Sequence, residues 1–218
     1  MEEGKSHISM AIFMTHHIRK TIFFAWLAVL PILIATMESV DAHGRPTGAP
    51  QKASGPVSFV SEVIDLRIGE NRVSVTGCYH MRSDLPGTHP APLAYPFPIG
   101  ASSEYPDTIR VFHGKNLTPV KFDEDRSGGM VFINIEAEGD FEFTVYYSQR
   151  IHAREAVYIL TTTKKWGAPL DSAVFRITLP DSLIPAYWSF SPDQVEKGKN
   201  DTTYAIHRTN FLPDHDLT

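Results

Sequence analysis

The sequence predicts an all-β protein: a single antiparallel β-sandwich of immunoglobulin-like architecture behind an N-terminal signal or anchor segment. After residue 56, apolar residues recur with period two, which is typical of strands with one buried face. Turn signals return roughly every 8 to 12 residues, the spacing of a sandwich. The chain of 218 residues also has 16 prolines, 14 glycines, 13 phenylalanines, 8 tyrosines and 3 tryptophans, a composition that suits a turn-rich β domain.

Residues 1–42 are expected to be a signal peptide or a membrane anchor. Residues 21–35 carry no charge, basic residues precede them, and Ala42 stands where signal peptidase would cleave. A membrane span needs about 20 apolar residues, and the apolar segment reaches only from residue 21 to residue 37. We therefore favour cleavage and expect a periplasmic or extracellular protein, with membrane contact only through residues 21–37 if the segment is retained.

The domain follows a flexible linker. Residues 43–56 are rich in proline and glycine and are expected to be this linker, and residues 57–218 are expected to form the β-sandwich domain. The apolar phase changes sides between Phe59 and Ile64, which indicates a β-bulge. A turn at residues 69–71 then leads into clean alternation, so the domain begins with a β-hairpin.

The proline-dense residues 83–106 are expected to form a loop, because proline lacks the N–H that a central strand donates. Tyr95, Phe97 and Tyr105 are expected to pack this loop against the core. Alternation and turn signals predict the later strands and one helical turn at residues 191–198. Those strands are residues 108–113, 119–122, 130–136, 141–148, 155–162, 173–179, 187–190 and 202–211, and residues 216–218 are expected to open one more.

Charge and cysteine content narrow the class of protein. The net charge of −5 offers no basic excess for binding phosphates, so nucleic acid is not an expected partner. The single cysteine, Cys78, cannot form an internal disulfide, and exported eukaryotic domains of this size usually carry several. These features favour a bacterial envelope protein. Cys78 lies within an alternating strand, which predicts a buried, unreactive thiol.

His43 is the starting point for a copper hypothesis. Cleavage after Ala42 would make His43 the first residue, and a free α-amine together with imidazole nitrogens binds copper. The further nitrogen would come from one of His80, His89, His113, His152 and His207. The alternative is that His43 begins a flexible tail, because such a site requires a fixed N-terminus. No other cofactor is expected.

Two other patterns resemble metal sites. Residues 123–128 begin like a calcium loop, but Asn134 stands where such a loop has a bidentate glutamate, so we expect an acidic hairpin tip. His215 lies between Asp214 and Asp216, in a segment that we expect to be frayed.

Four stretches of sequence carry a family resemblance. They are VSVTGCYHMRS (73–83), YPFPIG (95–100), AVYILTTTKKWGAPLDSAVFRITLP (156–180) and NFLPDHDL (210–217). In this order, over about half of the domain, they resemble an uncharacterised group of bacterial exported β-sandwich domains of unknown function. The resemblance implies export and a sandwich architecture, and it transfers no catalytic residue.

No catalytic motif is recognisable: the sequence has no Gly-x-Ser-x-Gly elbow, no His-Glu-x-x-His and no phosphate loop. We therefore expect a non-enzymatic binding or assembly module of the bacterial cell envelope, with a protein or glycan as its partner, rather than an enzyme. Tyr95 and Phe97 in the loop at residues 83–106 are the expected contact residues. A copper-binding protein using His43 is one alternative, and a carbohydrate-binding module using Trp166 and Trp188 is another.

Overall fold

The computed structural model describes residues 57–152 and 155–218. The expected leader at residues 1–42, the expected linker at residues 43–56 and His43, the residue of the copper hypothesis, all lie outside these described residues. Within them, no helix combines the length and the apolar character that crossing a membrane requires.

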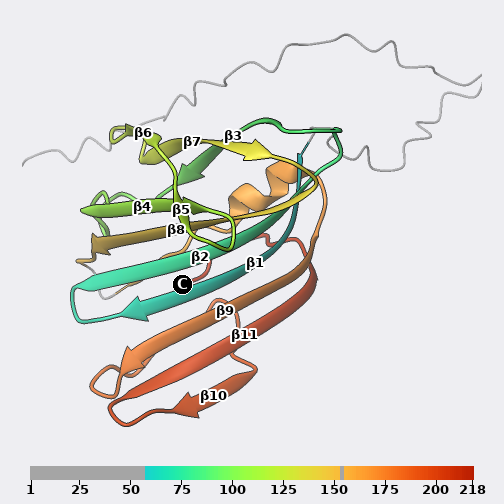
Figure 1. Ribbon diagram of the computed structural model, residues 1–218. Coiled ribbons are helices and arrows are strands. Elements are labelled where there is room, and N and C mark those ends of the chain that lie inside the picture. The colour runs from blue at the N-terminus through green and yellow to red at the C-terminus, as the bar shows by residue number, and fades with distance from the viewer. Residues whose placement is uncertain (1–56, 153–154) are drawn as a thin grey trace, which may run out of the picture. The chain divides into compact units, whose positions relative to one another are not determined.

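The described residues form an all-β fold with two sheets (Figure 1). The large sheet has the strand order β10-β11-β9-β1-β2-β8-β4-β5, and the small sheet has the order β3-β7-β6. The strands are β1 (Val57–Ile68), β2 (Arg72–Ser83), β3 (His89–Pro96), β4 (Thr108–His113), β5 (Thr118–Pro119), β6 (Phe122–Asp125), β7 (Met130–Ala137), β8 (Asp140–Arg150), β9 (Leu170–Pro180), β10 (Gln194–Lys197) and β11 (Asp201–Phe211), and a 3-10 helix, η1 (Thr161–Trp166), precedes β9.

The large sheet is mixed, so the prediction of a purely antiparallel fold was wrong. Strands β1 and β9 pair in parallel, with Val63 opposite Val174, whereas the other pairs of this sheet are antiparallel. A parallel neighbour requires a long crossover connection, and the segment from the end of β8 through η1 provides it. Alternation in the sequence identifies a strand and its buried face, but it does not identify the strand beside it.

The predicted hairpin and its bulge are confirmed. Strands β1 and β2 pair along their length, and the register shifts between Phe59 and Ser61. Phe59 lies opposite Met81, but after the shift Glu62 lies opposite Tyr79. Because side chains alternate between the two faces of a strand, the extra residue turns Glu62 toward the same face as Met81 and Tyr79, which is the buried face.

The core lies on this inner face of the large sheet. Ile64, Val145 and Phe175 are fully buried there. Two kinds of segment cover it. Tyr95 of β3 and the adjoining Phe97 both pack on Tyr147 of β8. Irregular segments cover the other strands: Tyr158 packs on Phe175 of β9, and Phe190 packs on Phe211 of β11. The inner face of the large sheet is therefore covered by residues in and next to β3 and by irregular segments.

Strand β3 runs through the segment that was expected to be a loop, so that prediction was wrong. The prolines are tolerated because β3 is an edge strand whose only neighbour in its sheet is β7. Pro90 and Pro92 are exposed, and the residues between and after them, Ala91 and Leu93, are buried. The aromatic residues do pack inward as predicted: Tyr95 and Phe97 are buried.

The structure bears out the predicted strands at residues 108–113, 130–136, 141–148, 173–179 and 202–211, with small differences at their ends. The predicted strand at residues 119–122 is divided between β5 and β6. Three other predictions were wrong. Residues 155–162 and 187–190 were expected to be strands, but the first range forms a single bridge and the start of η1, and the second is irregular. Residues 191–198 contain strand β10 instead of a helical turn. Strand β10 forms because the edge of β11 supplies its hydrogen-bond partners, which outweighs local helix preference.

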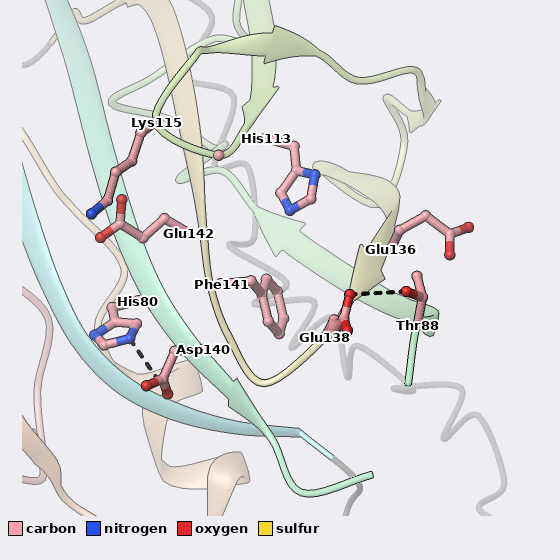
Figure 2. A pocket seen from close by; sticks show the side chains of 10 residues that line it. His80, Thr88, His113, Lys115, Glu136, Glu138, Asp140, Phe141 and Glu142 are labelled. Atoms are coloured by element: carbon pink, nitrogen blue, oxygen red, sulfur yellow. Dashed lines mark hydrogen bonds and ion pairs between the residues drawn. The ribbon is translucent and has the colours of Figure 1, made fainter. Parts of the chain in front are cut away.

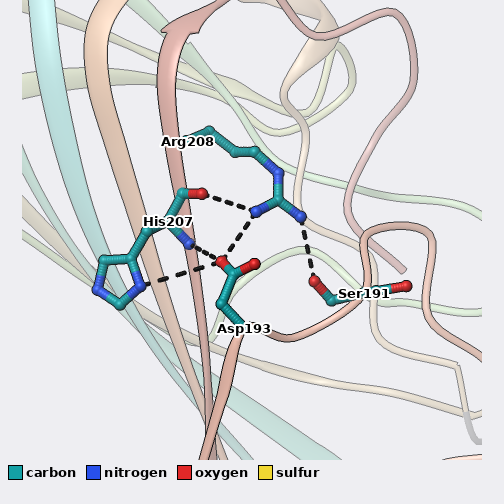
Figure 3. Close-up of polar contacts among 4 residues, drawn as sticks. All are labelled: Ser191, Asp193, His207 and Arg208. Carbon is teal, nitrogen blue, oxygen red and sulfur yellow. Dashed lines mark hydrogen bonds and ion pairs between the residues drawn. The ribbon is translucent and has the colours of Figure 1, made fainter.

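A polar cluster fixes the segment that leads into β10 (Figure 3). The Asp193 carboxylate accepts hydrogen bonds from the His207 backbone N–H (2.6 Å) and from the Arg208 guanidinium (2.9 Å). The guanidinium also donates to the Ser191 carbonyl oxygen (3.1 Å). These contacts hold the pKa of Asp193 below its ordinary value, first through the His207 N–H and then through Arg208.

Replacing Asp193 with asparagine is expected to lower the Tm more at pH 7 than at pH 3. A carboxyl group whose folded-state pKa is depressed contributes stability above its unfolded pKa, and this contribution is lost as the pH falls through the folded value. Thermal unfolding of wild type and Asp193→Asn between pH 3 and pH 7 tests this, with the exposed turn variant Glu70→Gln as control. A constant Tm difference at all pH values would contradict the ionic role.

Candidate functional site: a buried carboxyl group beside three tyrosine hydroxyls

Glu62 is the most unusual polar residue in the described fold. Its side chain points into the core from β1, only 3% of the residue is exposed, and Oε1 has no hydrogen-bond partner among the described residues. Burial without a partner disfavours the charged form of a carboxyl group. It raises the pKa of Glu62 to about 8. At neutral pH, Glu62 is therefore mostly an uncharged carboxylic acid.

Three tyrosine hydroxyls from different segments meet next to Glu62. The hydroxyl of Tyr79 on β2 shares hydrogen bonds with the hydroxyl of Tyr95 on β3 (2.8 Å) and with that of Tyr158 before η1 (2.8 Å). Burial raises the pKa of each of these tyrosines well above its ordinary value, so the hydroxyls stay protonated. Tyr79 thus links the other two hydroxyls, and the hydroxyl oxygens keep lone pairs that can accept further hydrogen bonds.

These residues surround a small cavity of about 60 Å³. Aromatic residues are the largest group in its lining, and among the described residues Glu62 is the one acidic side chain there, with no lysine, arginine or histidine. The aromatic lining residues are Phe59, Tyr79, Tyr95, Phe143, Tyr158 and Trp166. By the general size requirement of about 10–15 Å³ for one water, the cavity accepts a group of a few heavy atoms.

The cavity walls are held firmly. The Tyr79 ring stacks on Phe143 at a centroid distance of 4.7 Å, and Trp166 packs edge-on against Phe59 at 6.0 Å. The Asp216 carboxylate accepts hydrogen bonds from the backbone N–H groups of residues 160 and 161 (2.8 and 2.9 Å), where η1 begins. Because the chain from Tyr158 to Trp166 supplies one wall, this contact fixes that wall against the rest of the fold.

The structure places the predicted binding residues in different surroundings. Tyr95 and Trp166 both line the cavity, and Phe97 packs behind Tyr95 at a centroid distance of 5.4 Å. Trp188 lies elsewhere, against Tyr204 at 4.9 Å. The two tryptophans proposed for a carbohydrate-binding face thus have different ring partners.

Sequence reasoning missed Glu62 and Tyr79 as site residues. A signal for Glu62 was present, because it shares the apolar phase of Ile64 and Leu66 beyond the predicted bulge. A glutamate on the buried phase of a strand is uncommon and therefore informative. Tyr79 gave no such signal, since its contact with Tyr158 depends on how the irregular segment before η1 folds back.

A larger and more open hollow, of about 600 Å³, lies between β2, β4, β7 and β8 (Figure 2). Its polar side chains partly satisfy one another: Thr88 donates to Glu138 (3.1 Å), and His80 lies 3.7 Å from Asp140. His113 and Lys115 also line it. This hollow is a polar surface feature in which no enclosed, unpartnered group corresponds to Glu62.

The candidate metal ligands do not form one group, although His80 and His113 line the same hollow. His80 pairs with Asp140, His152 with Glu104 (2.8 Å) and His89 with Ser83 (2.5 Å). Over residues 57–152 and 155–218, no group of three or more histidine, cysteine, aspartate or glutamate side chains has the arrangement of a metal site.

The acidic segment at residues 123–128 is a hairpin tip between β6 and β7, as predicted. Asp125 accepts hydrogen bonds there from the Ser127 hydroxyl (2.7 Å) and the Gly128 N–H (2.9 Å).

Two other residues differ from expectation. His215 is not in a frayed segment: its ring stacks on Phe190 at 4.2 Å, and its nitrogens lie 2.6 Å from the Asp214 carboxylate and 3.1 Å from the Ser189 carbonyl oxygen. These two contacts raise the pKa of His215. Cys78 is half-buried rather than buried, and burial raises the pKa of its thiol, which disfavours the reactive thiolate.

The fold and the site define an all-β domain with an uncharged acid enclosed in an aromatic cavity. No protein-family model and no curated protein matches the sequence. Among solved structures, the chain is similar to a candidate nutrient binding protein from Legionella pneumophila, with a TM-score of 0.51 and 13% identity over 74% of this chain and 65% of that one.

More distant structural matches are an M1 zinc metallopeptidase from Deinococcus radiodurans (TM-score 0.44, 12% identity, 71% of this chain and 39% of that one) and native yeast LTA4 hydrolase (TM-score 0.42, 9% identity, 69% and 26%). The chain spans less than two thirds of the length of each of these three proteins. At such identities the likeness to the Legionella protein concerns the fold alone.

Proposed function

We propose that this domain is a non-enzymatic binding module that takes one end of a small ligand into the Glu62 cavity. The observation that carries the proposal is the enclosed Oε1 atom of Glu62, which has no partner among the described residues. Leaving such an acceptor unpaired costs about 1–3 kcal/mol. A ligand that supplies the missing hydrogen bond would remove this cost, which is a reason for a fold to keep an unpaired acceptor in a cavity.

The chemistry of the lining supports binding over catalysis. General acid–base catalysis uses groups positioned as pairs, and hydrolysis of glycosides uses two carboxyl groups. In the part of the chain that the structure describes, the lining has one carboxyl group, and the hydroxyls beside it belong to tyrosines whose raised pKa values keep them protonated. An aromatic cavity with a few convergent polar groups is instead typical of a small-molecule site.

We further propose that the module is exported and works in the bacterial cell envelope, in the periplasm or outside the cell. The uncharged segment at residues 21–35, followed by Val40 and Ala42 at the −3 and −1 positions of a signal-peptidase site, supports a cleaved leader. In this proposal the two sheets pack as an immunoglobulin-like sandwich, with the small sheet covering the β2 and β8 side of the large one. Intact-mass analysis of the exported protein tests the leader: retention of residues 21–35 would contradict cleavage.

Binding in the cavity is testable through the tryptophan side chains. Trp166 lines the cavity, whereas Trp188 packs on Tyr204. The indole signal of Trp188 therefore serves as an internal control. Acetamide, acetate, 1-propanol and propylammonium chloride are suitable probes for a cavity of about 60 Å³. We expect at least one of them to shift the Trp166 indole N–H signal in a saturable way in ¹⁵N NMR spectra, and to leave the Trp188 signal unchanged.

A cavity-blocking variant completes this test. Thr162 is half-buried on the cavity wall, so Thr162→Phe is expected to weaken the binding of every probe by at least about ten-fold. Equal shifts of both tryptophan signals, or an unchanged affinity in Thr162→Phe, would overturn binding at this site.

A further inference from the structure

We propose that the group recognised in the Glu62 cavity is a protonated amine, that is, a small organic ammonium or the ammonium end of a longer ligand. This inference rests on the proposed function and names the chemical class of its ligand. It follows from four properties of the cavity: its charge, its aromatic lining, its hydrogen-bond acceptors and its size.

The charge of the lining favours a cation. The described lining residues include one carboxyl group, that of Glu62, and no basic side chain to neutralise it. Coulomb attraction is strong where water is excluded. A bound cation would supply the countercharge that the fold itself does not provide.

The aromatic lining favours the same ligand. A ring presents a negative face, and an ammonium group within about 6 Å of the ring centroid is attracted to it. Six of the lining residues are aromatic, and Phe59 lies between Tyr79 and Trp166 with a centroid distance of 6.0 Å to each. Anions are disfavoured beside such faces, so a carboxylate or phosphate group is the poorer candidate.

The hydrogen-bond acceptors match an ammonium group. A primary ammonium carries three N–H donors. The Oε1 atom of Glu62 is an acceptor with no partner among the described residues, and each tyrosine hydroxyl oxygen has two lone pairs. The tyrosine hydroxyls therefore supply acceptors for N–H groups directed away from Glu62.

The size of the cavity limits what enters it. A volume of about 60 Å³ holds the ammonium and one or two adjoining carbons. Ala94 on β3 is exposed, and the half-buried lining residues include Thr162 and Trp166 on η1 and Phe59 on β1. The rest of a longer ligand would therefore leave beside Ala94, toward these residues.

Binding of an ammonium to Glu62 is linked to proton release. Glu62 must lose its proton to pair with the cation, because burial keeps its pKa at about 8 in the absence of a ligand. The O–H bond of the carboxylic acid breaks, the proton passes to solvent or buffer, and the carboxylate stays paired with the ammonium. An alkylammonium keeps its own proton up to about pH 10. Below pH 8, affinity should therefore rise about ten-fold for each pH unit.

The test compares propylammonium chloride with 1-propanol, which has the same number of heavy atoms and no charge. Each is titrated into the full chain at pH 6, 7, 8 and 9, and the Trp166 indole signal reports binding. The expected result is an affinity for propylammonium that rises about ten-fold per pH unit up to pH 8 and then levels, while the affinity for 1-propanol stays constant.

Glu62→Gln is the matched variant. It is expected to weaken propylammonium binding by at least about ten-fold and to leave 1-propanol within about two-fold of wild type. The pH profile of the wild type tests the proposal even if this variant fails to fold. A titration with KCl distinguishes an organic ammonium from an inorganic cation, and equal binding of potassium would overturn the proposed ligand class.

The outcomes separate the two proposals. Binding of 1-propanol or acetamide at Trp166 without binding of propylammonium would overturn the amine and leave the binding module standing. A pH-independent affinity for propylammonium would also overturn the pairing with Glu62. No response to any probe would overturn the proposed function itself.

Discussion

In the wild type, the free energy of unfolding is expected to fall by several kcal/mol between pH 5 and pH 9 relative to Glu62→Gln. The cause is the buried carboxyl group, whose folded-state pKa of about 8 lies above its ordinary value of 4.5. Between these two values the folded state holds a proton that the unfolded state has released. Stability therefore falls as the pH rises through this window, by up to about 1.4 kcal/mol per pH unit.

Glutamine isolates this effect because it has nearly the same shape and does not titrate. The side-chain amide of glutamine would also be buried without a hydrogen-bond partner. This changes the free energy of unfolding by a similar amount at every pH, because the amide does not titrate. The informative quantity is therefore the change of the difference between the two proteins with pH, on the order of 4 kcal/mol across the window. Urea unfolding of both proteins at pH 5, 6, 7, 8 and 9 measures it.

Glu136→Gln is the control, because Glu136 is an exposed residue on β7. Its stability profile is expected to run parallel to that of the wild type. A parallel profile for Glu62→Gln as well would mean that Glu62 is ionised in the folded protein at neutral pH, and the uncharged cavity acid would have to be abandoned. A ligand that binds as an ammonium would reduce the loss of wild-type stability above pH 7, because it stabilises the deprotonated folded form.

The sequence was most informative where local chemistry decides the structure. Alternation predicted β2 and its buried face, and the change of apolar phase predicted the bulge in β1. Both predictions use the two-residue period of a strand, which is visible in the order of neighbouring residues. The buried position of Glu62 follows from the same two facts, so half of the candidate site was within reach of sequence reasoning.

The remainder depends on contacts between distant residues. The sequence predicts a strand at residues 155–162, but Asp216 accepts hydrogen bonds from two of their N–H groups at the start of η1. A local pattern cannot predict this contact, because the partner is more than fifty positions away. The parallel pairing of β1 with β9 is likewise a property of the crossover, not of either strand. Tyr158 reaches Tyr79 only because this segment folds back, which explains why the tyrosine cluster was not predicted.

Gly77→Ala is expected to destabilise the domain by about 2–4 kcal/mol, although a glycine within a strand is normally less stable than alanine by about 0.5–1 kcal/mol. The Tyr79 side chain lies over Gly77 on the same strand. A Cβ atom at position 77 would clash with the Tyr79 hydroxyl and lie 2.5 Å from Cζ and 2.8 Å from Cε2 of its ring. The ring cannot move aside freely, because it stacks on Phe143 and its hydroxyl is bonded to Tyr95 and Tyr158.

The expected loss combines overpacking, which costs about 1–3 kcal/mol, with weakened tyrosine hydrogen bonds at about 1 kcal/mol each. Gly69→Ala is the matched control. A Cβ atom there would have Arg72 O as its nearest neighbour at 3.7 Å, an ordinary contact, so its effect is expected to stay within about 0.5 kcal/mol. Urea unfolding of both variants gives the comparison.

A second substitution separates the clash from any general intolerance of alanine at position 77. In a Tyr79→Leu background the large ring is gone, so adding the Gly77 substitution is expected to cost at least about 1 kcal/mol less than it does in the wild type. An equal cost in both backgrounds would show that Gly77 is needed for its backbone and not for the space it leaves. A smaller cost in the Tyr79→Leu background would instead mean that Gly77 leaves the space that the Tyr79 ring occupies. The same strand, β2, would then provide both the ring and the space that keeps its hydroxyl beside Glu62.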